Sequence, residues 1–156
     1  MRKLKIYLDT SVISHLDAPD APKEMADTLS LWEDIKAGMY TICISDLTMA
    51  EIDRCSEPKR SKMLDSLLNI EHVELSQDER AEQLSSLYFE VGGLPSKSKN
   101  DAMHIAIASV NDCDIILSWN FKHIVNLRAM TAVEYVNFKN RHKNIRILSP
   151  AMLLND

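Results

Sequence analysis

The chain has 156 residues and a mass of 17.7 kDa, which is about the size of one domain. Hydrophobic residues make up 46% and charged residues 26%, as in an ordinary soluble globular protein, so a disordered or fibrous chain is excluded. Eighteen Lys and Arg against 23 Asp and Glu give a net charge of −5. This charge argues against a protein that binds nucleic acid over its whole surface, but it is compatible with a local basic patch.

The cysteines and the N-terminus indicate the compartment. Cys43, Cys55 and Cys113 are an odd, scattered set without metal or redox spacing, so we interpret them as reduced thiols. The basic N-terminus lacks an apolar run long enough for a signal peptide. No stretch approaches the ~20 apolar residues needed to cross a membrane. We therefore expect one soluble, cytoplasmic domain that spans residues 1–156.

Short apolar strands alternate with amphipathic helices along the chain. We expect strands at residues 4–8, 40–44, 72–75, 114–118 and 145–148, and helices at 12–16, 23–36, 45–51, around 63–68, 78–91, 101–110 and around 131–139. In the first strand, Leu4, Ile6 and Leu8 alternate with Lys3, Lys5 and Tyr7, and Thr10 or Ser11 can cap the helix that follows. Strands alternating with helices pair in parallel through right-handed crossovers. The sequence predicts a three-layer α/β/α sandwich with a short, mainly parallel central sheet.

Four polar residues fall where ligands bind in open α/β sheets, outside the carboxyl ends of the strands. Asp9 ends the first strand, and Glu51 lies on the helix entered from the second. Asp101 opens the helix before the fourth strand, and Asn120 follows that strand. Each acid has an alternative explanation, because Asp9 could simply cap a helix, Asp101 could simply face a helix dipole, and Glu51 could be a solvated charge.

Several inward-facing acids cannot share one sheet edge without a cation between them. Oxygen ligands favour Mg²⁺ or Mn²⁺ over Zn²⁺, and such an ion suits phosphodiester hydrolysis. The chain has no GxGxxG, P-loop or GxSxG motif. Position 11 is Ser, not the second Asp of a nucleophilic-aspartate phosphatase. We interpret His104, three residues after Asp101, as a hydrogen-bonded core residue.

Three blocks resemble the PIN-domain ribonucleases, and within them the small VapC-like toxins of toxin–antitoxin pairs. The blocks are residues 6–11 (IYLDTS), 44–45 with 50–52 (IS, AEI) and 100–106 (NDAMHIA), and the resemblance extends over essentially the whole chain. It implies a PIN-like fold, a Mg²⁺- or Mn²⁺-dependent endoribonuclease, metal ligands at Asp9, Glu51 and Asp101, and an antitoxin partner. The family usually has a fourth acid where this chain has Asn120. A carboxamide adds no negative charge, so it remains open whether the site binds one metal ion or two.

Basic residues flank the blocks that carry the candidate ligands. Lys97 and Lys99 precede Asp101, and Lys122 follows Asn120, so with Ser11 they are candidate RNA contacts. A second basic cluster lies near the C-terminus and could equally be a solvated face. It consists of Lys139, Arg141, Lys143 and Arg146.

Two other functions stay open. The first is a catalytically weak PIN-like module that binds RNA or a protein, which Asn120 favours, and the second is a metal-dependent phosphatase for small phosphoesters. The first two helices carry more apolar residues than one face packed on the sheet would need. We therefore also expect a homodimer that binds an antitoxin segment. These residues are Val12, Ile13, Leu16, Leu29, Leu31 and Trp32.

Overall fold

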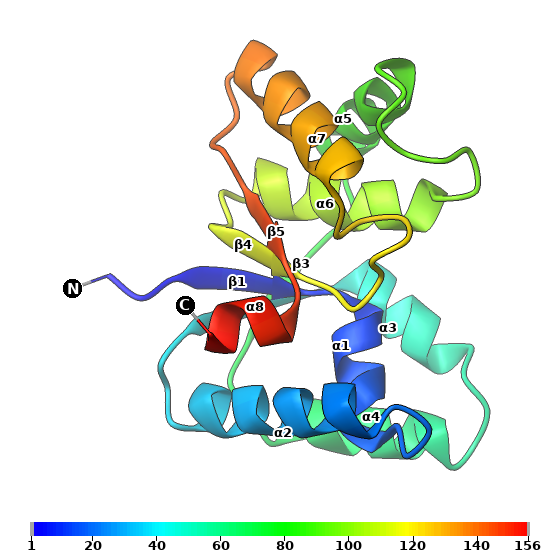
Figure 1. Ribbon diagram of the computed structural model, residues 1–156, viewed down its shortest axis with the longest axis vertical. Coiled ribbons are helices and arrows are strands. Elements are labelled where there is room, and N and C mark those ends of the chain that lie inside the picture. The colour runs from blue at the N-terminus through cyan, green and yellow to red at the C-terminus, as the bar shows by residue number, and fades with distance from the viewer. Residues whose placement is uncertain (1, 156) are drawn as a thin grey trace.

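The computed structural model describes residues 2–155 and arranges them in three layers (Figure 1). The middle layer is a five-stranded sheet in which every pairing is parallel and the strand order is β3-β2-β1-β4-β5. The strands are β1 (Lys5–Leu8), β2 (Thr41–Ser45), β3 (Val73–Leu75), β4 (Ile115–Leu117) and β5 (Arg146–Leu148). The predicted α/β/α sandwich is confirmed, and each strand lies within one residue of its expected position.

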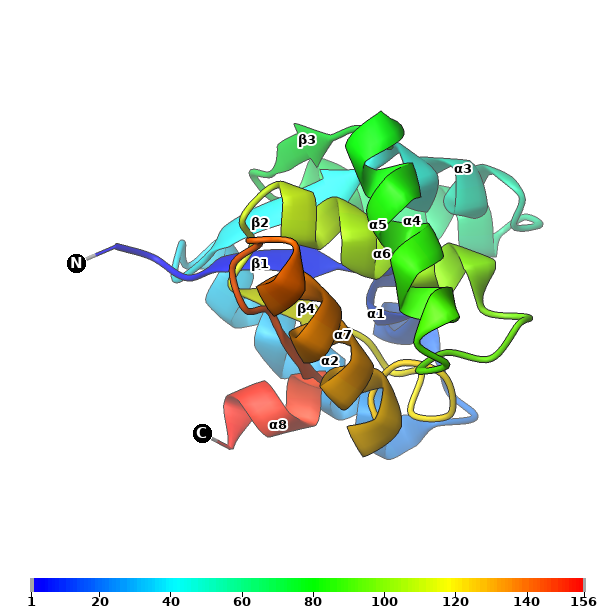
Figure 2. The ribbon, with the colours of Figure 1, turned by 90° about the horizontal axis from the view of Figure 1, so that it is seen from above.

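Helices cover both faces of the sheet, as Figures 1 and 2 show. One face carries α5 (Glu79–Glu90), α6 (Lys99–Val110) and α7 (Leu127–Lys139). The other elements are α1 (Thr10–Ser14), the 3₁₀ turn η1 (His15–Asp17), α2 (Pro22–Lys36), α3 (Asp46–Asp53), α4 (Lys59–Leu68) and α8 (Pro150–Leu154). Buried side chains form two hydrophobic cores, one on each face. No helix within residues 2–155 is long and apolar enough to span a bilayer.

The central strand β1 is buried on both faces. Ile6 and Leu8 belong to the core on the α2 side, whereas Tyr7 belongs to the core under α6, and all three are 0% exposed. The alternation in the sequence grouped Tyr7 with Lys3 and Lys5 and so suggested a polar environment, which is wrong. β1 pairs with β2 and β4 and has helices above and below, so no residue at its centre reaches water.

The first helix begins earlier than expected, and its cap is Asp9 rather than Thr10 or Ser11. The Asp9 carboxylate accepts a hydrogen bond from the Val12 N–H (3.3 Å), which satisfies a free donor of the first turn. A capping role for Asp9 was one of its two interpretations, and it is confirmed. Such a cap also fixes the carboxylate at the end of β1.

One helix begins earlier than predicted and another was not predicted, each for a local reason. Helix α7 begins four residues early because Asn126 caps it, accepting from the Ala129 N–H at 2.9 Å. Helix α8 was not predicted, although Ser149 at its N-cap and Pro150 at its first position are typical start signals. A helix of five residues is too short to show the periodicity on which sequence interpretation depends.

Candidate active site

The four predicted residues lie at one edge of the sheet, outside the carboxyl ends of the strands. The Asp9 N–H donates to the Leu117 carbonyl (3.2 Å), which extends the pairing of β1 with β4. Glu51 is carried by α3, which starts directly after β2 with Ser45 as its cap. Asp101 stands in the first turn of α6. Figure 1 shows α1, α3 and the start of α6 together at this edge.

Asp9 is a buried carboxylate, 3% exposed, that is held by neutral donors. Its Oδ1 accepts from the Ser11 hydroxyl at 2.6 Å, and the Ser11 oxygen accepts from the Trp119 N–H at 2.9 Å. Burial raises the pKa of Asp9, and the nearby His104 ring and the Ser11 hydroxyl oppose this rise. No Lys or Arg within residues 2–155 forms an ion pair with Asp9. A buried negative charge without a cationic partner is a place where a cation would bind.

Glu51 is held on both oxygens by residues of three different segments. Its Oε1 accepts from the Thr10 hydroxyl (2.7 Å) and from His104 Nε2 (2.5 Å), and its Oε2 accepts from the Asn100 amide (3.4 Å). Burial alone would raise the pKa of Glu51, but the His104 hydrogen bond, helped by Thr10, lowers it overall. The alternative that Glu51 is a solvated surface charge is therefore wrong.

His104 connects Glu51 to the centre of the sheet. It is 2% exposed, and its Nδ1 lies 2.5 Å from the Tyr7 hydroxyl, which lies 2.6 Å from Ser45 Oγ. Burial raises the pKa of Tyr7 far above its usual range, so the phenol keeps its proton. The interpretation of His104 as a hydrogen-bonded core residue is confirmed. The structure adds that this chain of side chains orients Glu51.

Asp101 and Asn120 contact each other directly. The Asn120 amide nitrogen donates to Asp101 Oδ2 at 3.2 Å, and His123 Nδ1 lies 3.2 Å from the same oxygen. The Asn120 side-chain oxygen accepts from the His123 N–H (3.1 Å). The carboxamide thus bridges the Asp101 carboxylate and the backbone after β4. Its oxygen, the atom that could bind a metal, is engaged by the protein.

The donor set suits a hard divalent cation in its chemistry. Asp9, Glu51 and Asp101 supply carboxylate oxygens, which Mg²⁺ and Mn²⁺ prefer. Thr10 and Asn100, the chain neighbours of Asp9 and Asp101, both contact Glu51, so Glu51 connects the segments that carry the other two acids. Within the described part of the chain, no three His, Cys, Asp or Glu side chains lie close enough together to hold a metal ion in this arrangement. The carboxylates are instead engaged by protein donors.

Residues 6–124 match the family model of the PIN domain. The chain belongs to the PIN domain family. Its fold is similar to that of VapBC2 from Rickettsia felis, whose crystal structure is bound to a DNA fragment from the VapBC2 promoter. The two chains are 18% identical with a TM-score of 0.56, and the match covers 94% of this chain and 98% of that one. It is also similar to VapC20 from Mycobacterium tuberculosis, a Sarcin-Ricin loop cleaving toxin, with 16% identity, a TM-score of 0.52 and coverage of 75% and 91%. No curated protein matches the chain.

The candidate RNA contacts of this PIN domain differ in their surroundings. Lys97, Lys99 and Lys122 are exposed, and none of them forms an ion pair with another residue of the described chain. Ser11 is different, because its hydroxyl is already bonded to Asp9 and to the Trp119 N–H. The three lysines stay free to approach a phosphate, whereas Ser11 holds the first acid in place.

Apart from Thr10, for which the family resemblance implied support of the first acid, the residues that orient the acids of this PIN domain were not predicted. Thr10 and Asn100 are chain neighbours of two predicted acids, and this adjacency was the available signal. Tyr7 gave no signal, because the strand pattern placed it among polar neighbours. The contact of His123 with Asp101 depends on the turn that follows β4, which the sequence does not show.

The apolar residues that suggested a homodimer mostly lie in the interior of this PIN domain. Val12, Ile13, Leu31 and Trp32 are buried in the core on the α2 side, and Leu16 packs against it. Leu29 is exposed, at 44%. The excess of apolar residues on α1 and α2 therefore covers the sheet, and this argument for a dimer fails.

Proposed function

We propose that this PIN domain is a divalent-metal-dependent endoribonuclease and the toxin of a toxin–antitoxin pair. The observation that carries the proposal is that Asp9, Glu51 and Asp101 stand on segments that are connected through Glu51, by way of Thr10 and Asn100, at one edge of the sheet. Asp9 is buried there without a cationic partner, although a buried carboxylate is costly unless its charge is balanced. Mg²⁺ or Mn²⁺ bound by these oxygens would balance it.

Each residue of the site has a distinct part in the proposed mechanism. Asp9, Glu51 and Asp101 would hold the cation, and a bound cation would supply an activated water and stabilise the negative charge that develops on the phosphoryl oxygens. His104 and Thr10 keep Glu51 in place, and Asn120 keeps Asp101 in place. The exposed side chains of Lys97, Lys99 and Lys122 would bind the RNA backbone on either side of the acids.

The structural neighbours support the choice of substrate and partner. VapC20 is a toxin that cleaves the Sarcin-Ricin loop, and VapBC2 was solved with promoter DNA. From these neighbours we infer RNA as the substrate and an antitoxin as the partner of this chain. A homodimer is part of the same proposal, and a mass measurement of the purified protein by light scattering tests it.

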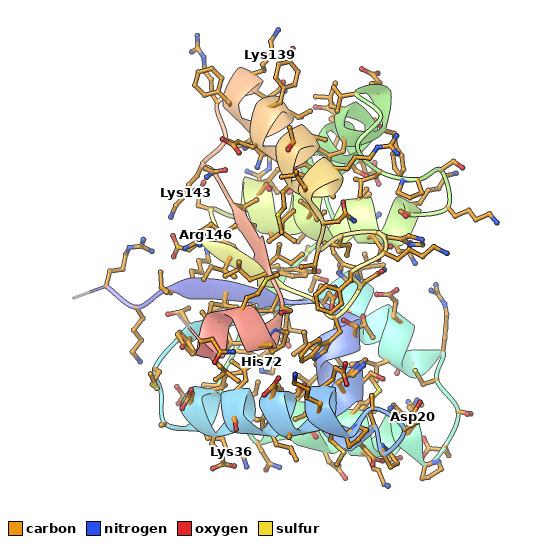
Figure 3. The ribbon with its side chains drawn as sticks, in the orientation of Figure 1. Asp20, Lys36, His72, Lys139, Lys143 and Arg146 are labelled. Atoms are coloured by element: carbon orange, nitrogen blue, oxygen red, sulfur yellow. The ribbon has the colours of Figure 1, made fainter. Side chains whose placement is uncertain are left out.

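The decisive experiment is RNA cleavage by the purified, partner-free protein with Mg²⁺, with Mn²⁺ and with chelator. Asp9→Asn should abolish metal-dependent cleavage, because it removes the buried ligand charge. Asp20→Asn is the control, since Asp20 is an exposed acid between η1 and α2 (Figure 3) and takes no part in the hydrogen bonds of Asp9, Glu51 or Asp101. Cleavage by Asp9→Asn at the parent's rate would show that Asp9 serves only as a cap.

Asn120 favours a second candidate function, a PIN-like module that binds RNA without cleaving it. The fourth position carries no charge, and the carboxamide oxygen is engaged with the His123 N–H rather than free to bind an ion. Binding of RNA by the parent, without cleavage in either metal, would support this candidate. Mn²⁺-dependent cleavage that Asp9→Asn removes would exclude it.

A further inference from the structure

Basic residues outnumber acidic residues near the C-terminus of this chain. Residues 115–146 contain six Lys and Arg but a single acid, Glu134, although the whole chain carries a charge of −5. Lys139, Lys143 and Arg146 lie along one side of the molecule in Figure 3, from the end of α7 to β5. Lys143 is neutralised by Asp114. Lys139 and Arg146 are exposed, and neither forms an ion pair within residues 2–155.

The same part of the molecule exposes two aromatic rings. Tyr135 is 53% exposed and Phe138 is 83% exposed, one helical turn apart on the outer side of α7. The Lys139 ammonium lies 5.6 Å from the centre of the Tyr135 ring. The rings line a hollow of about 500 Å³, the other lining residues being Thr131, Glu134, His142 and Asn144. Exposed rings beside cations are the groups on which unpaired bases stack.

The turn after α7 contains a residue in a costly backbone conformation. Arg141 has φ = 61°, in the left-handed region, where helices usually end with Gly. Its N–H donates to the Phe138 carbonyl, and the His142 N–H donates to the Asn137 carbonyl, so the turn closes the helix in the usual way. A glycine would form this turn with less strain. The arginine therefore contributes a side chain that the turn itself does not need.

We propose that Tyr135, Phe138, Lys139 and Arg141, here called the α7 surface, bind a single-stranded segment of RNA at a distance from the acids. The identification of that RNA as a substrate rests on the proposed function. Tyr135 and Phe138 stack on bases, and Lys139 and Arg141 contact phosphates. Helix α7 starts seven residues after Asn120 and runs for about 20 Å, so one RNA strand can reach both places.

Charge favours RNA over a protein partner at this surface. A groove for an apolar helix would need no cluster of cations, whereas Lys139 lies over the Tyr135 ring and the Arg141 backbone is bonded to Phe138. The local excess of positive charge on an acidic protein matches a phosphate backbone. The α7 surface also lies outside the candidate active site, so it would hold RNA without taking part in the chemistry.

The first test measures binding of a fluorescent, single-stranded RNA of ~20 nucleotides to the full chain in chelator, where metal-dependent cleavage cannot occur. Phe138→Ala and Tyr135→Ala should each weaken binding about 5- to 150-fold, which is the loss of one stacked base. Both side chains are exposed, so the variants should fold. Leu68→Ala is the matched control, because Leu68 is 82% exposed on α4, and it should bind like the parent.

Arg141→Gly separates RNA binding from stability. It should raise the melting temperature by about 2–4 °C, because glycine relieves the left-handed strain. It should nevertheless weaken RNA binding, and the slope of log affinity against log salt should fall by about 0.7 for the lost phosphate contact. Phe138→Ala should leave this slope unchanged, since it removes no charge.

Substrate length distinguishes this proposal from the proposed nuclease function. The α7 variants should lower kcat/KM for the ~20-nucleotide RNA but not for one of ~3 nucleotides, which is too short to reach both places. RNA binding through the α7 surface without cleavage in any metal would refute the nuclease and support this inference. Parent-like RNA affinity in Phe138→Ala and Tyr135→Ala would refute it. A Phe138→Ala variant that changes the solution mass but not the RNA affinity would also refute this inference. The α7 surface would then join copies of the chain.

Discussion

Replacing Tyr7 with Phe tests whether the buried chain of side chains behind Glu51 matters for activity. The substitution removes a single oxygen from the centre of the sheet and keeps the ring. That oxygen lies 2.6 Å from Ser45 Oγ and 2.5 Å from His104 Nδ1. Ser45 keeps its bond to the Thr48 N–H, but His104 Nδ1 loses the partner that fixes the ring opposite Glu51.

The expected cost follows from burial. Tyr7 is 0% and His104 is 2% exposed, so water cannot replace the lost hydroxyl. A buried polar atom left without a partner costs about 1–3 kcal/mol of unfolding free energy. For a chain of this size, that corresponds to a melting temperature about 3–10 °C lower. If Glu51 holds a metal ion, loosening its support should lower activity about 10- to 100-fold.

Tyr88→Phe is the matched control, since Tyr88 is another fully buried tyrosine. Its hydroxyl bonds to Asn137 Oδ1 (2.6 Å) and to Ser109 Oγ (3.2 Å), away from the acids. Both variants should lose similar stability in thermal denaturation. Only Tyr7→Phe should need more Mg²⁺ or Mn²⁺ for half-maximal RNA cleavage, measured well below either melting temperature. Equal losses of activity in the two variants, or none in Tyr7→Phe, would refute the reasoning.

Three further outcomes concern charge and assembly. The Arg2 guanidinium, helped by Lys143, holds the pKa of Asp114 well below its usual range against the opposing effect of burial. Asp114→Asn should therefore cost about 1–3 kcal/mol in urea unfolding at about pH 7, and this difference should shrink below about pH 4, where the unfolded carboxylate is protonated. Asn120→Asp places a second carboxylate beside Asp101, and like charges raise each other's pKa. The melting temperature of the metal-free variant should therefore fall as pH rises above about 4. Added Mg²⁺ should restore this melting temperature. Light scattering should give the mass of a dimer, and a concentration-independent monomer mass would contradict it.

The fold could be predicted closely because its signals are local. The five strands are short runs rich in apolar residues, and their alternation with helices leaves few arrangements besides a parallel sheet. The errors occurred where the environment of a residue depends on distant parts of the chain. Tyr7 was grouped with polar neighbours because the sequence does not show that β2 and β4 flank β1.

The candidate site was predictable in its members but not in its contacts. Parallel strands end at one edge, so Asp9, Glu51 and Asp101 were expected at the same edge of the sheet once the fold was assumed. Their partners come from far away in the sequence: His104 is 53 residues from Glu51 and 97 from Tyr7. No local pattern encodes such pairings, because they depend on how α6 sits over the sheet.

Asn120 shows why a substitution at a site position has to be judged by its contacts. From the sequence, a carboxamide in place of an acid is a weaker metal ligand that binds through oxygen. In the structure, the oxygen faces the His123 N–H and the amide nitrogen faces Asp101, the one orientation in which both neighbours are satisfied. The reverse orientation would set two acceptors against each other at about 3 Å. Asn120 therefore supports Asp101 when no metal is bound, whereas an acid there would need an ion to balance it. We therefore expect the one missing charge to stabilise the metal-free protein and to lower its affinity for metal at the same time, since both effects come from the same charge.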